Sequence, residues 1–165
     1  MATLLNVVPW SQVRHWQCLG CGECCRLQVQ LTTGEWLGLG QTYGHGLIGE
    51  GVDGFYIRKT VEDWCPFLYR QVADRYCSLQ RTKPLACRLW PFRMSNQPTH
   101  GNEEAARFPY RNGIYYVYLV PFCRGISYGR PTEFFAKRVV PEFLDMRLGL
   151  RREQDFSTRK LNGLW

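Results

Sequence analysis

Eight cysteines are the residues of this 165-residue sequence best suited to chemistry. Four stand together as Cys18-x2-Cys21-x2-Cys24-Cys25, and four follow singly: Cys65, Cys77, Cys87 and Cys123. An x2 spacing lets two sulfurs converge on one point, and Gly20 and Gly22 supply the conformational freedom that such a turn needs. Three thiolates from one short loop and a distant fourth are a common way of holding an iron–sulfur cluster. All eight cysteines are therefore candidate metal ligands.

The alternative for so many cysteines is a secreted disulfide scaffold. The first ten residues contain no basic segment ahead of an apolar run, and Asn6 and Pro9 interrupt their apolar residues. The sequence thus predicts no signal peptide, and it contains no run near the roughly 18 apolar residues of a membrane span. We expect a cytoplasmic protein, because a reducing compartment keeps cysteines free to bind metal.

The spacing of the single cysteines favours iron–sulfur over zinc. Zinc sites prefer paired C-x2-C knuckles, and the cysteines after Cys25 form none. Scattered single ligands suit a bulkier cluster, so we expect one or two 4Fe-4S clusters, with zinc as the alternative cofactor. Cys24 and Cys25 are adjacent, and neighbours on an extended chain point in opposite directions. This favours two centres over a bond between them, while the assignment of ligands to each centre stays open.

Two arginines directly follow cysteines. Arg26 follows Cys25 and Arg88 follows Cys87. A guanidinium beside a metal–thiolate centre can donate to sulfur and offset its negative charge, which tunes the reduction potential. We therefore predict Arg26 and Arg88 to be cofactor-binding residues, with a solvated surface position as the alternative.

The predicted elements that must position the cysteines are short. Alternation predicts a strand at residues 27–31, and Thr32 or Thr33 is expected to cap a helix over 34–42. Five glycines predict a loop over 44–54. A helix is expected over 83–90, a strand over 114–120, and a helical stretch from about residue 130 that Pro141 kinks or restarts.

These elements predict a small, irregular α+β fold, rich in cysteine and stapled by metal centres. Sixteen Gly and nine Pro residues impose many turns on a core that 45% hydrophobic composition allows. We divide the chain into a cysteine-cluster domain, residues 1–126, and a basic helical C-terminal extension, residues 127–165, packed on it.

The order of the cysteine motifs resembles a known family. The matching segments are Cys18-Leu-Gly-Cys21-Gly-Glu-Cys24-Cys25, Cys65-Pro-Phe-Leu, Cys77, Arg81-Thr-Lys-Pro-Leu-Ala-Cys87-Arg-Leu-Trp-Pro-Phe, and Cys123-Arg-Gly. Over roughly residues 16–126 the chain is similar to the YkgJ-type CxxCxxCC cysteine-cluster family, described as zinc- or iron-chelating and often as Fe–S oxidoreductases. The resemblance implies metal binding.

Two functions of different classes follow. The first is an electron-transfer protein or redox accessory subunit with a redox or larger-complex protein partner; whether it is itself an oxidoreductase stays open. The second is a zinc-stapled adaptor that binds a protein or RNA through its basic, aromatic-interleaved C-terminal half. Residues 81–165 carry fifteen Lys and Arg against seven Asp and Glu. Anionic metal–thiolate centres would offset much of this excess, so a solvated basic face is a simpler interpretation than RNA binding.

Overall fold

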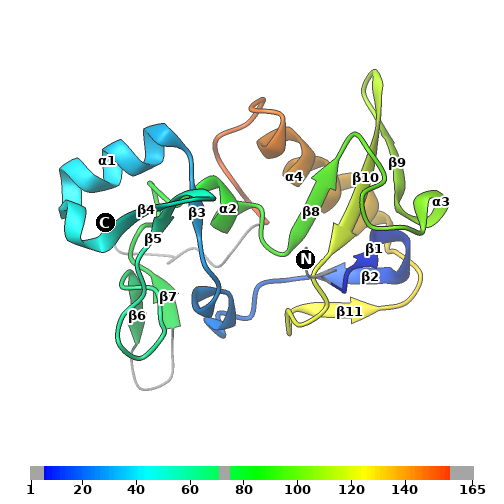
Figure 1. The fold of residues 1–165 in the computed structure, drawn as a ribbon. Coiled ribbons are helices and arrows are strands. Elements are labelled where there is room, and N and C mark those ends of the chain that lie inside the picture. The colour runs from blue at the N-terminus through cyan, green and yellow to red at the C-terminus, as the bar shows by residue number, and fades with distance from the viewer. Residues whose placement is uncertain (1–5, 71–74, 157–165) are drawn as a thin grey trace. The chain divides into compact units, whose positions relative to one another are not determined.

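The computed structural model describes residues 6–70 and 75–156. Short antiparallel strands and short helices alternate along the chain (Figure 1), which confirms the predicted α+β class. Two compact units emerge, of which unit 1 comprises residues 6–19 and 89–156 and unit 2 comprises Gly20–Arg88. The sequence-based boundary at residue 126 stays a prediction, and residues 157–165 of the predicted extension lie outside the described chain.

Unit 1 is built on the strand that the sequence predicts most clearly. β10 (Gly113–Leu119) pairs antiparallel with three partners, β1 (Val8–Pro9), β8 (Phe92–Ser95) and β9 (Arg107–Tyr110). β2 (Val13–Trp16) pairs with β11 (Ile126–Tyr128) in a second, two-stranded sheet. The remaining elements are a 3-10 turn (Trp10–Gln12), α3 (Glu103–Ala106), a π-helical turn (Phe135–Val139) and α4 (Val140–Arg147).

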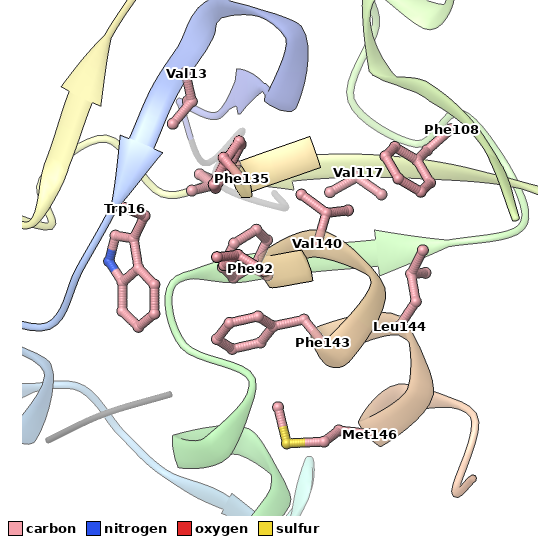
Figure 2. Close-up of a cluster of buried hydrophobic side chains, with 12 residues drawn as sticks. Val13, Trp16, Phe92, Phe108, Val117, Phe135, Val140, Phe143, Leu144 and Met146 are labelled. Carbon is pink, nitrogen blue, oxygen red and sulfur yellow. The ribbon is translucent and has the colours of Figure 1, made fainter. Parts of the chain in front are cut away.

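An aromatic core holds unit 1 together (Figure 2). The rings of Phe92 and Phe143 stack with centroids 4.1 Å apart, and the edge of Trp16 meets Phe143 at 5.4 Å. Phe135, also fully buried, adds a further ring against Phe92. Each buried aromatic removes a large apolar area from water, so unit 1 has a core of ordinary composition.

The helical stretch at the end of unit 1 begins and restarts as the sequence predicts. Thr132 Oγ1 accepts a hydrogen bond from the Phe135 amide at 3.2 Å, and the π-helical turn then leads into α4. Pro141 lies in the first turn of α4, directly after the π-helical turn, so the hydrogen-bond pattern of the helix changes where the proline lacks an amide donor. The buried carboxylate of Glu142 accepts from the amides of Asp155 and Phe156, which fastens the following segment to α4.

Unit 2 combines short strands with two helices of unequal length. β4 (Ile48–Gly51) and β3 (Gln30–Leu31) flank β5 (Gly54–Ile57), and β6 (Leu68–Arg70) pairs with β7 (Arg75–Cys77). The helices are α1 (Thr33–Tyr43), which contacts β4 and β5 (Figure 1), and α2 (Leu85–Arg88). Two 3-10 turns, Glu23–Arg26 and His45–Leu47, complete the unit.

The predicted helix at 34–42 is confirmed as α1, with Thr32 as its cap. The Thr32 hydroxyl accepts from the Glu35 amide, and the Glu35 carboxylate accepts from the Thr32 amide, which is a complete capping box. The predicted loop at 44–54 is wrong, because β4 occupies part of it. Gly49 lies in that strand, and it is a glycine because a Cβ there would stand 2.6 Å from the nearest carbon of the Tyr56 ring. The glycine that suggested a loop is thus required by side-chain packing within a strand.

No helix of the described chain combines the length and the apolar character needed to cross a membrane.

We predict that Gly125→Ala strongly destabilises unit 1. The Gly125 carbonyl accepts from the Gln17 amide at 3.1 Å, and a Cβ at Gly125 would stand 2.0 Å from the Gln17 carbonyl oxygen. Because backbone cannot yield as a side-chain tip can, the free energy of unfolding should fall by about 2 kcal/mol or more. Urea denaturation followed by circular dichroism measures it.

Gly38→Ala is the matched control. Gly38 is exposed in α1, and nothing lies within 4 Å of the point where its Cβ would stand. Since alanine favours a helix over glycine, this variant should gain roughly 0.5–1 kcal/mol. Equal stability of the two variants would contradict the backbone clash at Gly125.

Candidate metal centre

All eight cysteines lie in the described chain as free thiols. Cys18 and Cys123 belong to unit 1, and the other six, Cys21, Cys24, Cys25, Cys65, Cys77 and Cys87, belong to unit 2. The structure therefore contains no disulfide between these eight cysteines, unlike the secreted scaffold considered as the alternative.

The Glu23–Arg26 turn brings Cys24 and Cys25 together. Gly22 begins the turn with φ +74°, a left-handed conformation that favours glycine, and its carbonyl accepts from the Cys25 amide at 2.9 Å. The two side chains interact, because the thiol of each shifts the pKa of the other. The prediction that these neighbours point in opposite directions is wrong, because it assumed an extended chain where the chain forms a 3-10 turn.

Three further segments bring cysteines to the same interior. The Cys65 amide donates to the Cys25 carbonyl at 2.8 Å, which ties that segment to the turn. Cys77 lies on β7, and Cys87 lies on α2. Cys65 is part of the apolar core of unit 2, and Cys25, Cys77 and Cys87 pack against that core. Thiols from four separate segments thus share one apolar cluster.

We call Cys24, Cys25, Cys65, Cys77 and Cys87 the thiol cluster. Its members interact electrostatically with one another. Burial raises the pKa of Cys65 to about 11, and burial also raises the pKa of Cys77 and Cys87. The side-chain interaction between Cys24 and Cys25 lowers the pKa of Cys24 and raises that of Cys25. Deprotonation in this interior therefore needs added positive charge, which a metal supplies.

The thiol cluster matches a sulfur-seeking metal by donor type. Thiolate donors select zinc, copper(I) and iron–sulfur clusters over hard cations. As placed, no three Cys, His, Asp or Glu side chains of the described residues stand in position to hold one ion together. Metal binding therefore requires the thiols to turn toward a common centre.

The two cysteines of unit 1 lie beside its aromatic core. Both pack against that core, and the buried Trp16 indole donates to the Cys123 sulfur at 3.3 Å. Trp16 pairs with Ile126 across the β2–β11 sheet, and the amide of the following residue, Gln17, donates to the Gly125 carbonyl. An N–H donor to sulfur stabilises its anionic form, so Cys123 has a built-in hydrogen bond for a thiolate.

The two arginines predicted beside the centre have different surroundings. Arg26 lies over the Trp64 ring, with its guanidinium carbon 4.1 Å from the ring centroid. Arg88 is half-buried at the end of α2. The guanidinium groups of Arg70 and Arg75 also lie over Trp64, at 4.6 and 5.2 Å. The predicted cofactor-binding roles of Arg26 and Arg88 stay predictions.

Sequence reasoning missed two basic residues of unit 2. Arg75 donates to the Cys21 carbonyl at 3.0 Å and therefore holds the chain just ahead of the Glu23–Arg26 turn. Lys83 is only 4% exposed and interacts electrostatically with Cys24, Cys77 and Cys87. Its position in sequence, between Cys77 and Cys87 and directly ahead of Pro84, could have indicated a place near the cysteines. The sequence analysis interpreted this segment only as the start of a helix.

Several basic residues of the C-terminal half are engaged in ion pairs within unit 1. Arg111 pairs with Asp145 at 3.1 Å, and Lys137 pairs with Glu133 at 2.5 Å. Arg151 pairs with Asp155 at 2.5 Å. These pairs are largely exposed and leave the net positive charge of residues 81–165 unchanged, so the RNA-binding alternative stays a prediction.

We predict that Arg75→Gln loosens the chain around the Glu23–Arg26 turn. The variant loses the charged hydrogen bond to the Cys21 carbonyl, so the free energy of unfolding should fall by about 1 kcal/mol, and bound metal should pass to a chelator faster. The measurements are denaturant titration and the rate of metal release to a chromophoric chelator.

Arg70→Gln is the matched control for Arg75→Gln. Arg70 lies on the partner strand and over the same Trp64 ring, but it pairs with the exposed Glu62. A surface pair of this kind contributes about 0.5 kcal/mol or less. Metal release that is equally fast in both variants would mean that the Cys21 bond does not hold the turn.

Comparison with known proteins gives one match. The model of the CxxCxxCC family, described as a "putative zinc- or iron-chelating domain", matches residues 17–110. No curated protein and no solved structure matches the chain. The matched residues include seven of the eight cysteines and every member of the thiol cluster.

Proposed function

Since the chain belongs to the CxxCxxCC family of zinc- or iron-chelating domains, we propose that it binds an iron–sulfur cluster of the 4Fe-4S type and serves in electron transfer as a redox accessory protein. The thiol cluster of unit 2 supplies the ligands. A reducing, cytoplasmic setting is part of this proposal, because it keeps the thiols free, and so is a protein redox partner.

One observation carries the proposal. Cys25, Cys65, Cys77 and Cys87 reach the same apolar interior from four separate segments. A cluster offers irons at several corners and so suits ligands that arrive one at a time, whereas zinc prefers ligands paired in knuckles. Because each of these cysteines comes from a different segment, their arrangement favours an iron–sulfur cluster over a zinc ion.

The residues of this chain would govern access and charge. Leu79 and Phe67 are buried in the core that Cys65 belongs to, so they would provide an apolar environment on that side of a bound centre. A bound cluster would supply one-electron oxidation and reduction, and burial and hydrogen bonds to sulfur set its potential. Cys18, Cys21, Cys24 and Cys123 stay candidate ligands, so one or two clusters are compatible with the proposal.

Zinc is the second candidate. The family description includes it equally, and unit 2, in which the segments that carry the thiol cluster are strands and helices of three or four residues or loops, would gain from a structural ion. In that case we propose that the chain would serve as an adaptor for a protein partner, with RNA as the alternative that its basic C-terminal half suggests.

Anaerobic purification followed by metal and acid-labile sulfide analysis decides between the two. We expect a brown protein containing iron and sulfide in equal amounts. A colourless, zinc-loaded protein without sulfide, obtained from cells supplied with iron, would overturn the redox function and leave the adaptor function.

Single cysteine variants test the proposed ligands. Cys77→Ser and Cys87→Ser should each lose most of the bound metal and melt earlier, because metal binding contributes to folding. Ala86→Ser is the matched control, since Ala86 is exposed on α2 beside Cys87 and its replacement adds a hydroxyl without removing a thiol. Full metal content in both cysteine variants would show that the centre lies elsewhere.

A further inference from the structure

The helix α2 carries Cys87 of the thiol cluster, but it is only one turn long. A single turn fixes the backbone angles of several residues for very few internal hydrogen bonds, so it forms only where the rest of the protein supports it. In α2 the amides of Cys87 and Arg88 donate to the Pro84 carbonyl at 3.0 and 2.9 Å. The position of Cys87 therefore depends on contacts that α2 makes with other elements.

A side chain of α1 makes such a contact. Glu35 Oε1 accepts from the amide of Leu85, the first residue of α2, at 2.7 Å. The first amides of a helix have no acceptor within the helix, so an oxygen from elsewhere has to satisfy them. The first turn of α2 contains no acidic side chain of its own. Glu35 thus supplies from another helix the acceptor that α2 lacks.

Glu35 is itself held in place at the start of α1. Its Oε2 accepts from the Thr32 amide at 2.9 Å, and its own amide donates to Thr32 Oγ1 at 3.2 Å, which together form the capping box of α1. One carboxylate therefore caps α1 with one oxygen and binds α2 with the other. α2 also contacts β3, the strand that ends directly ahead of Thr32 (Figure 1).

Cys87 lies two residues after Leu85, in the same turn, and packs against the apolar core of unit 2. A ligand whose backbone is already fixed loses less conformational freedom when metal binds, which raises the affinity. We propose that Glu35 is a positioning residue that holds α2, and with it Cys87, in place for metal binding. This inference rests on the proposed metal binding, and Glu35 acts through Cys87 without being a ligand.

The test compares Glu35→Ala with Thr32→Ala in the full-length protein. Thr32→Ala removes the hydroxyl of the α1 cap but keeps the bond between Glu35 and Leu85, so it is the matched control. Zn²⁺ alone serves as the probe, in anaerobic competition with a chromophoric chelator at fixed pH and salt. We expect Glu35→Ala to bind Zn²⁺ at least about tenfold more weakly, the loss typical of groups that support metal ligands.

The control should behave differently in the same assay. Thr32→Ala should lower the melting temperature because a helix cap is lost, while its affinity for Zn²⁺ stays within about threefold of wild type. Equal zinc affinity in the two variants would overturn the inference.

Amide hydrogen exchange of the metal-free proteins, measured by NMR, locates the change. The amides of Cys87 and Arg88 report on α2 because both donate to the Pro84 carbonyl. They should exchange faster in Glu35→Ala than in Thr32→Ala. Exchange that accelerates equally throughout unit 2 would mean that Glu35 stabilises the unit as a whole, and the inference would be wrong.

A double variant shows whether the effect of Glu35 passes through Cys87. In a Cys87→Ser background the thiol that Glu35 positions is gone, so adding Glu35→Ala should change the remaining zinc affinity by less than about threefold, since effects that share one ligand are not additive. A further tenfold loss would show that Glu35 acts on a different part of the thiol cluster, against the inference.

The folding of the variants decides between the remaining outcomes. If Glu35→Ala folds only with zinc, the rate of zinc release from the loaded proteins replaces the affinity, and it should be faster in Glu35→Ala than in Thr32→Ala. If Glu35→Ala folds in neither form while Thr32→Ala does, Glu35 has a general structural role and the inference is wrong. A wild type that binds no metal is a different result, because it removes the proposed function itself.

Discussion

Unit 2 depends on the burial of thiols in and against an otherwise apolar core. Cys65 belongs to that core together with aliphatic side chains such as Val29 and Leu79, and Cys25, Cys77 and Cys87 pack against it. Burial raises the pKa of Cys65, Cys77 and Cys87, so this interior favours neutral thiols unless positive charge is added. A bound metal would supply that charge, and its binding would then contribute to the stability of the unit.

The core of unit 1 contains mainly aromatic and aliphatic side chains. The stacked rings of Phe92 and Phe143, with the edge of Trp16, fill its interior with apolar area, and α4 closes it. Of its buried carboxylate, Glu142 Oε1 accepts from the amides of residues 155 and 156, which ties the end of the described chain to α4. We infer that unit 1 is far less dependent on metal for its fold than unit 2.

Charge in this protein is organised locally as well as globally. Three arginines, Arg26, Arg70 and Arg75, lie over the ring of Trp64. A guanidinium is more weakly hydrated than an ammonium and stacks on aromatic rings, so the Trp64 ring is a favourable place for these side chains. The ring explains where Arg26 lies, and its predicted role toward the thiols stays a prediction.

The sequence by itself determined the kind of chemistry, since eight cysteines with tandem x2 spacing predict metal ligands wherever they come to lie. It also determined elements whose signals are local: the Thr32 cap of α1, the strand β10 and the restart at Pro141. The turn that Cys24 and Cys25 share and the strand β4 come from contacts only a few residues away, Gly22 with Cys25 and Tyr56 against Gly49, which residue composition did not reveal. The folded structure was needed to show that Lys83 is buried and that the Cys65 amide meets the Cys25 carbonyl, because a local pattern does not encode a contact between segments remote in sequence.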